Sequence, residues 1–100
     1  MDNLEIINKA IRERKIITFI YESELRGVEP FLTGAHIDTS NDSLRAWWTF
    51  GYTKSNNTPN WRLYTIDQMI DIQITENIFD TNRIYYNPSD KHMSKIYECI

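Results

Sequence analysis

The sequence predicts an α+β fold that is mostly β, with an N-terminal helix packed on a five-stranded antiparallel sheet. A short amphipathic segment opens the chain, and β-branched and aromatic runs separated by turn residues follow it. The length of 100 residues suffices for a single core. We therefore expect one domain over residues 1–100, with a helix over 1–14, a closed or nearly closed barrel over 15–75 and a C-terminal strap or edge strand over 76–100.

The composition narrows the classes of function. The chain has a formal net charge of -3, and an acidic chain is poorly suited to non-specific duplex binding, which depends on neutralising phosphates. Its single cysteine, Cys99, excludes an intramolecular disulfide and a cysteine zinc site. The acidic N-terminal residues and the lack of a long apolar run predict a cytoplasmic protein with no signal peptide and no membrane contact.

The first element is predicted to be a short amphipathic helix. Asp2 followed three residues later by Glu5 has the form of a capping box. Ile7 and Ile11 then recur at helical spacing. A helix of this length is marginal alone, so we expect its apolar face to lie on the sheet.

A hairpin is predicted next. Residues 15–21 are β-branched and aromatic on both faces, as in a strand that is buried on both sides. Residues 22–24 form the turn, and residues 26–32 form a second strand. Pro30 lacks an N–H group, so we expect it at a sheet edge or a bulge. Residues 33–43 are predicted to be a polar loop.

The next strand, Leu44–Tyr52, contains two adjacent tryptophans and has a clear alternation. One face carries Leu44, Ala46, Trp48, Phe50 and Tyr52, and the other carries Arg45, Trp47, Thr49 and Thr53. We expect the first set to face the core, which leaves Trp47 beside Arg45 on the more polar face. A one-residue bulge would reverse this assignment.

Two further strands are predicted after the turn residues 54–60. Residues 61–66 form the first of them. After a brief break, the alternating isoleucines of residues 70–74 form a half-buried last strand. The periodicity then fades, and residues 96–100 could be an edge strand or part of an irregular strap.

Four motifs follow one another in a distinctive order: Ile16–Tyr21, Arg26-Gly27-Val28-Glu29-Pro30, Trp47–Tyr52 and Arg62–Asp67. Their order resembles that of the WYL family of bacterial regulators, over about two-thirds of the chain. The resemblance implies a small Sm-like β-barrel that binds nucleic acid or nucleotide-like ligands and regulates something attached. The chain looks like a divergent, stand-alone WYL-like protein of bacterial or phage origin, without the winged-helix reader of the regulators.

The candidate ligand site consists of arginine and aromatic side chains: Tyr21, Arg26, Arg45, Trp47, Arg62 and Tyr64. Arginine offers a bidentate fork to phosphate or carboxylate, and aromatic rings stack on bases. We therefore expect a non-enzymatic module that binds a nucleotide, an oligonucleotide or a similar planar anion, without a cofactor. The alternative is a protein-interaction or self-association module of a regulatory or defence system. Its partner would be another protein or a second copy of the chain.

Structural roles are open for some of the same side chains. Small barrels need large rings to fill them, so we expect Trp48 and Trp61 in the core. Trp47, on the less apolar face, could serve either role. For Arg62, the alternative to a ligand contact is a salt bridge to one of two carboxylates, Asp67 or Glu29.

No pattern in the sequence indicates catalysis or a metal site. His36 and His92 lie far apart in the sequence, with no nearby carboxylate cluster. Cys99 lacks an evident activating base. We therefore predict that the protein is not an enzyme and holds no metal.

Overall fold

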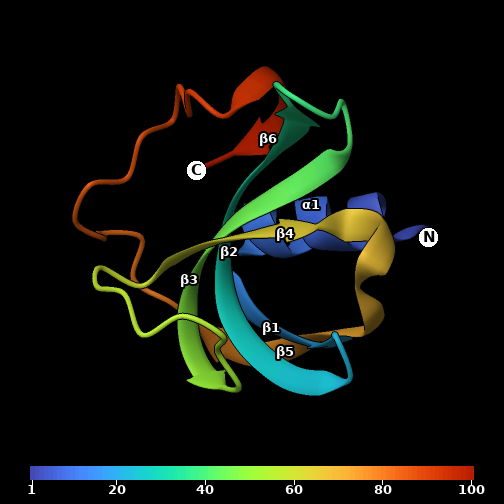
Figure 1. Ribbon diagram of the computed structural model, residues 1–100. Coiled ribbons are helices and arrows are strands. Elements are labelled where there is room, and N and C mark those ends of the chain that lie inside the picture. The colour runs from blue at the N-terminus through green and yellow to red at the C-terminus, as the bar shows by residue number, and fades with distance from the viewer.

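The structure is a computed structural model that describes residues 1–100. It confirms the coarse fold class, one N-terminal helix and an antiparallel sheet, shown in Figure 1. The elements are α1 (Asn3–Glu13), β1 (Lys15–Tyr21), β2 (Glu24–His36), β3 (Asp42–Gly51), β4 (Trp61–Thr65), the short 3-10 helix η1 (Ile66–Gln68), β5 (Ile70–Ile78) and β6 (Met93–Cys99).

The helix α1 is fixed at both ends by local interactions. The Asp2 carboxylate accepts a hydrogen bond from the Glu5 backbone N–H at 2.9 Å, which completes the predicted capping box. Arg14 ends the helix in the left-handed conformation, with φ 58°. Ile7 and Ile11 are fully buried, so the predicted apolar face lies on the sheet.

The sheet has the strand order β4-β3-β2-β1-β5, and every pair is antiparallel. One edge of β2 is shared: its first half pairs with β1 and its second half pairs with β6. Figure 1 shows β2 and β3 curving strongly across the molecule. No strand pairing joins β4 to β5, so the sheet is open and the predicted closure into a barrel is not formed.

Strand β2 is longer than the sequence pattern indicates. The predicted polar loop over 33–43 is wrong, because residues 33–36 continue the strand and residues 42–43 begin the next one. Strand β6 covers the added part of β2, and the Thr33 hydroxyl donates to Asn8 Oδ1 at 2.6 Å. Pro30 lies beside a register shift between β2 and β3, as expected for a proline at a bulge.

The tryptophan strand β3 faces the core over only part of its length. Leu44 and Ala46 are fully buried, as predicted. A register shift then places Trp48 opposite Val28 but Phe50 opposite Gly27. The extra residue turns the Phe50 ring to the outer face, where it is 41% exposed, so the prediction that this ring lies in the core is wrong.

The main core lies between α1 and one face of the sheet. It contains Ile7, Ala10, Ile11, Ile17, Phe19, Val28, Leu44, Ala46, Tyr64, Ile66, Met69 and Ile72. Each large side chain buried there contributes about 1.5–3 kcal/mol. The single α-helix of the fold is neither long nor apolar enough to cross a membrane.

A second, smaller aromatic cluster lies under the segment that joins β5 to β6. We call residues 79–92 the strap, and Figure 1 shows it in orange along one side of the molecule. The strap cluster consists of Phe31, Trp61, Phe79 and Tyr86, with the Phe31 ring centroid within 4.9–5.3 Å of the other three. These rings attach the strap to β2 and β4.

Candidate functional site

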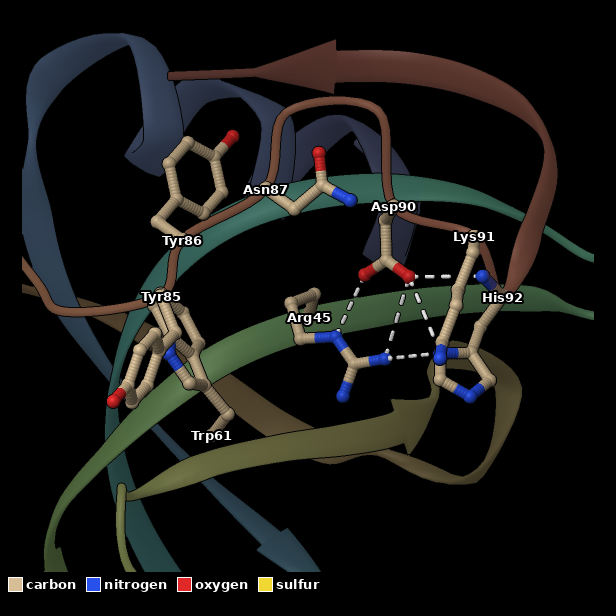
Figure 2. A pocket seen from close by; sticks show the side chains of 8 residues that line it. All are labelled: Arg45, Trp61, Tyr85, Tyr86, Asn87, Asp90, Lys91 and His92. Atoms are coloured by element: carbon tan, nitrogen blue, oxygen red, sulfur yellow. Dashed lines mark hydrogen bonds and ion pairs between the residues drawn. The ribbon is translucent and has the colours of Figure 1, made fainter.

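A single pocket opens between the strap and strands β3 and β4, with a volume of about 390 Å³. Its size falls within the range of small-molecule sites. Figure 2 shows the residues that line it: Arg45, Trp61, Tyr85, Tyr86, Asn87, Asp90, Lys91 and His92. We call this the strap pocket.

Two of its aromatic side chains are held rigidly. The Trp61 Nε1–H donates to the Ile84 carbonyl at 2.8 Å, and the ring packs edge-on against Phe31. The Tyr86 hydroxyl donates to the Ile100 carbonyl at 3.2 Å. Burial raises the pKa of Tyr86, which keeps its hydroxyl neutral. The aromatic part of the pocket is therefore fixed before any ligand arrives.

Tyr85 differs from these two rings. Its side chain is 76% exposed, and its backbone has φ 65°. The left-handed conformation costs a non-glycine residue about 1–2 kcal/mol. A large apolar ring presented to solvent on a strained backbone is a pattern associated with binding sites.

The other part of the pocket is polar and charged. Arg45 donates from Nε to Asp90 Oδ2 at 2.7 Å, and its Nη2 lies 3.1 Å from His92 Nδ1. Figure 2 shows this network, in which Asp90 also accepts the His92 backbone N–H at 3.0 Å. The Nη1 atom of Arg45 has no partner, and neither does the Lys91 ammonium. These two cationic groups are available to a ligand.

Asp90 is only 7% exposed, yet its pKa lies below the usual value. Burial alone would raise the pKa, but the hydrogen bonds from Arg45 and from the His92 backbone outweigh that effect. A carboxylate with a lowered folded-state pKa stabilises the protein above its unfolded pKa of about 4, and this contribution is lost as the pH falls through the folded value. Asp90 therefore holds the strap in place at neutral pH.

We expect the free energy of unfolding of Asp90→Asn to change less with pH in the acid range than that of the wild-type protein. The variant should be less stable than wild type at pH 7. The difference should shrink as the pH falls from about 4, where the unfolded carboxyl group becomes protonated, through the lower folded-state pKa. Urea unfolding at a series of pH values measures this. Asp38→Asn, in the exposed turn after β2, is the matched control. Equal acid dependence in the two variants would contradict the role of Asp90.

Of the six predicted site residues, only Arg45 lines the strap pocket. Tyr21, Arg26 and Tyr64 do come together, but at a filled position. The Arg26 guanidinium carbon lies 5.1 Å from the centre of the Tyr21 ring and 5.8 Å from that of Tyr64. Arg26 is buried and donates to the Tyr21 carbonyl at 3.2 Å. This cluster leaves no cavity for a ligand.

Arg62 holds the loop between β3 and β4. Its Nη2 donates to the carbonyls of Ser55 at 2.9 Å and Asn57 at 3.2 Å. It makes no ion pair with either expected carboxylate, Asp67 or Glu29. Arg62 therefore has a structural role, in which it donates hydrogen bonds to backbone carbonyls instead of forming the expected salt bridge.

Trp47 lies behind the pocket and does not line it. Its ring packs edge-on against Trp61 at 5.3 Å, and the Arg83 guanidinium covers it at 4.8 Å. Arg83 in turn donates to both carboxylate oxygens of Glu29, at 2.8 and 2.7 Å. Trp47 therefore supports the pocket wall and the strap.

Most of the pocket comes from strap residues that the sequence analysis did not assign to the ligand site: Tyr85, Tyr86, Asn87, Asp90, Lys91 and His92. The one local signal was the adjacent pair Tyr85-Tyr86 before a turn. Trp61, expected in the core, lines the pocket and is only partly buried. His36 and His92, distant in the sequence, bring their rings to 6.4 Å, but no group of three metal-ligating side chains forms.

No family model, curated protein or solved structure matches the chain. The resemblance to the WYL family therefore rests on the order of the sequence motifs. The functional argument rests on the geometry of the strap pocket.

Proposed function

We propose that the chain is a non-enzymatic ligand-binding domain whose strap pocket takes a nucleotide, an oligonucleotide or a similar planar anion. The observation that carries the proposal is the presence, in one pocket, of aromatic rings and of two cationic groups that keep free donors, Arg45 and Lys91. Trp61 and Tyr85 provide faces on which a base can stack, worth about 1–3 kcal/mol per base. Arg45 and Lys91 provide the cations that an anion requires.

The proposal includes a WYL-like role and an Sm-like barrel architecture. The strongly bent run of strands in the order β4-β3-β2-β1-β5 supports this architecture in an open form, since β4 and β5 do not pair. In this role, ligand binding in the cytoplasm of a bacterium would regulate a partner or an attached domain. Among the arginines and aromatics expected from the sequence, Arg45 then contacts the ligand, and the other five support the fold around it.

Thermal unfolding with and without ligands tests the proposal. We expect at least one nucleotide or short single strand to raise the unfolding midpoint. At a hundredfold its dissociation constant, a ligand stabilises the fold by about 2.7 kcal/mol. Each kcal/mol shifts the midpoint of a domain of this size by roughly 4–8 °C, so the expected shift is roughly 11–22 °C. Isothermal titration calorimetry would then give the affinity.

Tyr85→Gly should abolish most of that shift without unfolding the protein. The change removes the exposed ring and also relieves the left-handed backbone, which glycine adopts freely. Ser40→Gly is the matched control, because Ser40 also has a positive φ, 63°, but lies outside the pocket. If Tyr85→Gly and Ser40→Gly gave the same ligand shift as wild type, Tyr85 would have no part in binding.

If the protein is well folded and none of these ligands raises its unfolding midpoint, the result would favour the alternative, a protein-interaction or self-association module. The feature that supports this alternative is the outer edge of β5, which pairs with no other strand. Ile70 and Ile78 are exposed on β5. Unpaired edges with exposed apolar residues readily pair with another chain.

A further inference from the structure

We infer that the strap pocket is built for one nucleotide unit that carries a singly charged phosphodiester, and that it disfavours nucleoside di- and triphosphates. This inference rests on the proposed function and specifies the class of its ligand. It follows from the charge, the free donors and the size of the pocket.

The charge of the pocket is close to +1. Arg45 and Lys91 contribute two positive charges, and the Asp90 carboxylate removes one. The His92 Nδ1 atom lies 3.1 Å from Arg45 Nη2 and 3.4 Å from Asp90 Oδ1, and the imidazole is left out of the formal charge. One positive charge balances one phosphodiester.

The free donors suit a single phosphate group. Arg45 Nη1 and Lys91 Nζ are cationic donors that no protein group occupies, and His92 Nε2 also has no protein partner. Polyphosphates are usually held by a glycine-rich loop or a helix N-terminus, where several backbone N–H groups converge. The three glycines of this chain, Gly27, Gly34 and Gly51, all lie in strands away from the pocket. The pocket therefore has no cradle for a second or third phosphate.

The size of the pocket and the net charge of the chain also favour a ligand with a single phosphate group. A volume of about 390 Å³ is near the lower end for small-molecule sites, which suits one base with its sugar. The Asn87 side chain lies between Tyr86 and Asp90 in Figure 2, and its amide nitrogen is free to reach a base or sugar edge. The net charge of the chain, -3, adds long-range repulsion against a highly charged ligand.

A nucleoside phosphodiester can come from two sources, a cyclic nucleotide or a single strand. Calorimetric titration of the full chain should therefore use the four 3′,5′-cyclic ribonucleoside monophosphates, the four matching 5′-triphosphates, and an RNA tetranucleotide that contains all four bases. We expect a cyclic nucleotide or the tetranucleotide to bind at least tenfold more tightly than any triphosphate. Binding of only the cyclic form, or only the strand, would identify the source.

A triphosphate that bound as tightly as its cyclic counterpart would overturn this inference but leave the proposed function standing. No binding by any probe would overturn both. The two failures are therefore distinguishable in one set of titrations.

The salt dependence and a lysine variant give a second test. For the tetranucleotide, one phosphate contact predicts a slope of about -0.7 for log K against log salt concentration. Lys91→Gln should weaken binding of the preferred probe about tenfold, which is the effect of losing about 1.4 kcal/mol, and Lys91→Arg should restore most of it. Lys9→Gln, at an exposed lysine of α1, makes the same change in net charge outside the pocket and should bind like wild type. A slope steeper than about -2, or equal affinities for Lys91→Gln and Lys9→Gln, would contradict a single phosphate held at Lys91.

Discussion

Replacing Arg83 with alanine is expected to lower the free energy of unfolding by about 3 kcal/mol or more, as for other broken buried ion pairs. The Glu29 side chain is 4% exposed and receives two hydrogen bonds from Arg83. Without Arg83, this carboxylate stays buried with no compensating charge. The variant also uncovers the Trp47 ring, which supports the wall of the strap pocket.

Two further variants test, by urea unfolding, whether the uncompensated charge of Glu29 causes this loss of stability. Arg12→Ala breaks the Arg12–Glu98 pair at the surface, where Arg12 is 57% exposed, and should cost less than about 1 kcal/mol. Adding Glu29→Gln to Arg83→Ala should recover much of the lost stability, because the uncompensated charge is gone. If Arg83→Ala were no worse than Arg12→Ala, the strap would not depend on this pair.

Phe31→Ala should destabilise the protein by about 3–5 kcal/mol, the usual cost of truncating a buried phenylalanine. Phe31 is fully buried and touches three rings of the strap cluster, so its removal leaves a cavity under the strap. We expect the loss in global stability to be accompanied by faster amide hydrogen exchange over residues 79–92. Ligand binding in the strap pocket should weaken as well, because Trp61 and Tyr86 lose their support.

Phe50→Ala is the matched control for this change. Phe50 lies in the same sheet but is exposed on the outer face, so its removal creates no cavity in the strap cluster. We expect it to cost less than half as much as Phe31→Ala and to leave exchange in the strap unchanged. Equal effects of the two substitutions would show that the strap cluster does not hold the strap.

The elements that could be predicted from the sequence are those with local determinants. The capping box of Asp2 and Glu5 fixes the start of α1, and β-branched residues fix β1, whose observed bounds are Lys15–Tyr21. The turn between β1 and β2 also depends on adjacent residues, Glu22 and Ser23, which both adopt positive φ. Local interactions of this kind leave a pattern within a few residues.

The failures occurred where a distant partner decides the structure. Residues 33–36 look like the start of a loop because they include Gly34 and precede a polar run, but β6 pairs with them from the other end of the chain. A bulge between β2 and β3 decides which way Phe50 faces, and nothing in the alternation of β3 reveals it. The register of a pair of strands is a property of both strands.

The sequence predicted which types of side chain form the candidate site, but not which residues of the chain supply them. Arginine and aromatic side chains do meet in the pocket, yet Arg45 is the one predicted member that lines it. The other predicted residues make contacts within the fold instead, as Arg26 does with the Tyr21 carbonyl and ring. Most of the other lining residues belong to the strap, whose sequence has no periodicity. The strap is held in position by the Asp90–Arg45 pair and by the strap cluster.

The shared edge of β2 has a consequence for how the chain reaches this structure. Strands β1 to β5 join neighbours that lie close in the sequence, apart from β5 returning to β1. The second half of β2 keeps one side uncovered until β6 arrives from the far end of the chain. In that interval, the uncovered side offers unpaired backbone groups to any β6 within reach, including that of a second chain. Exchange of β6 between two chains is therefore the misassembly to which this topology is most open, and the strap pocket would then form between two chains.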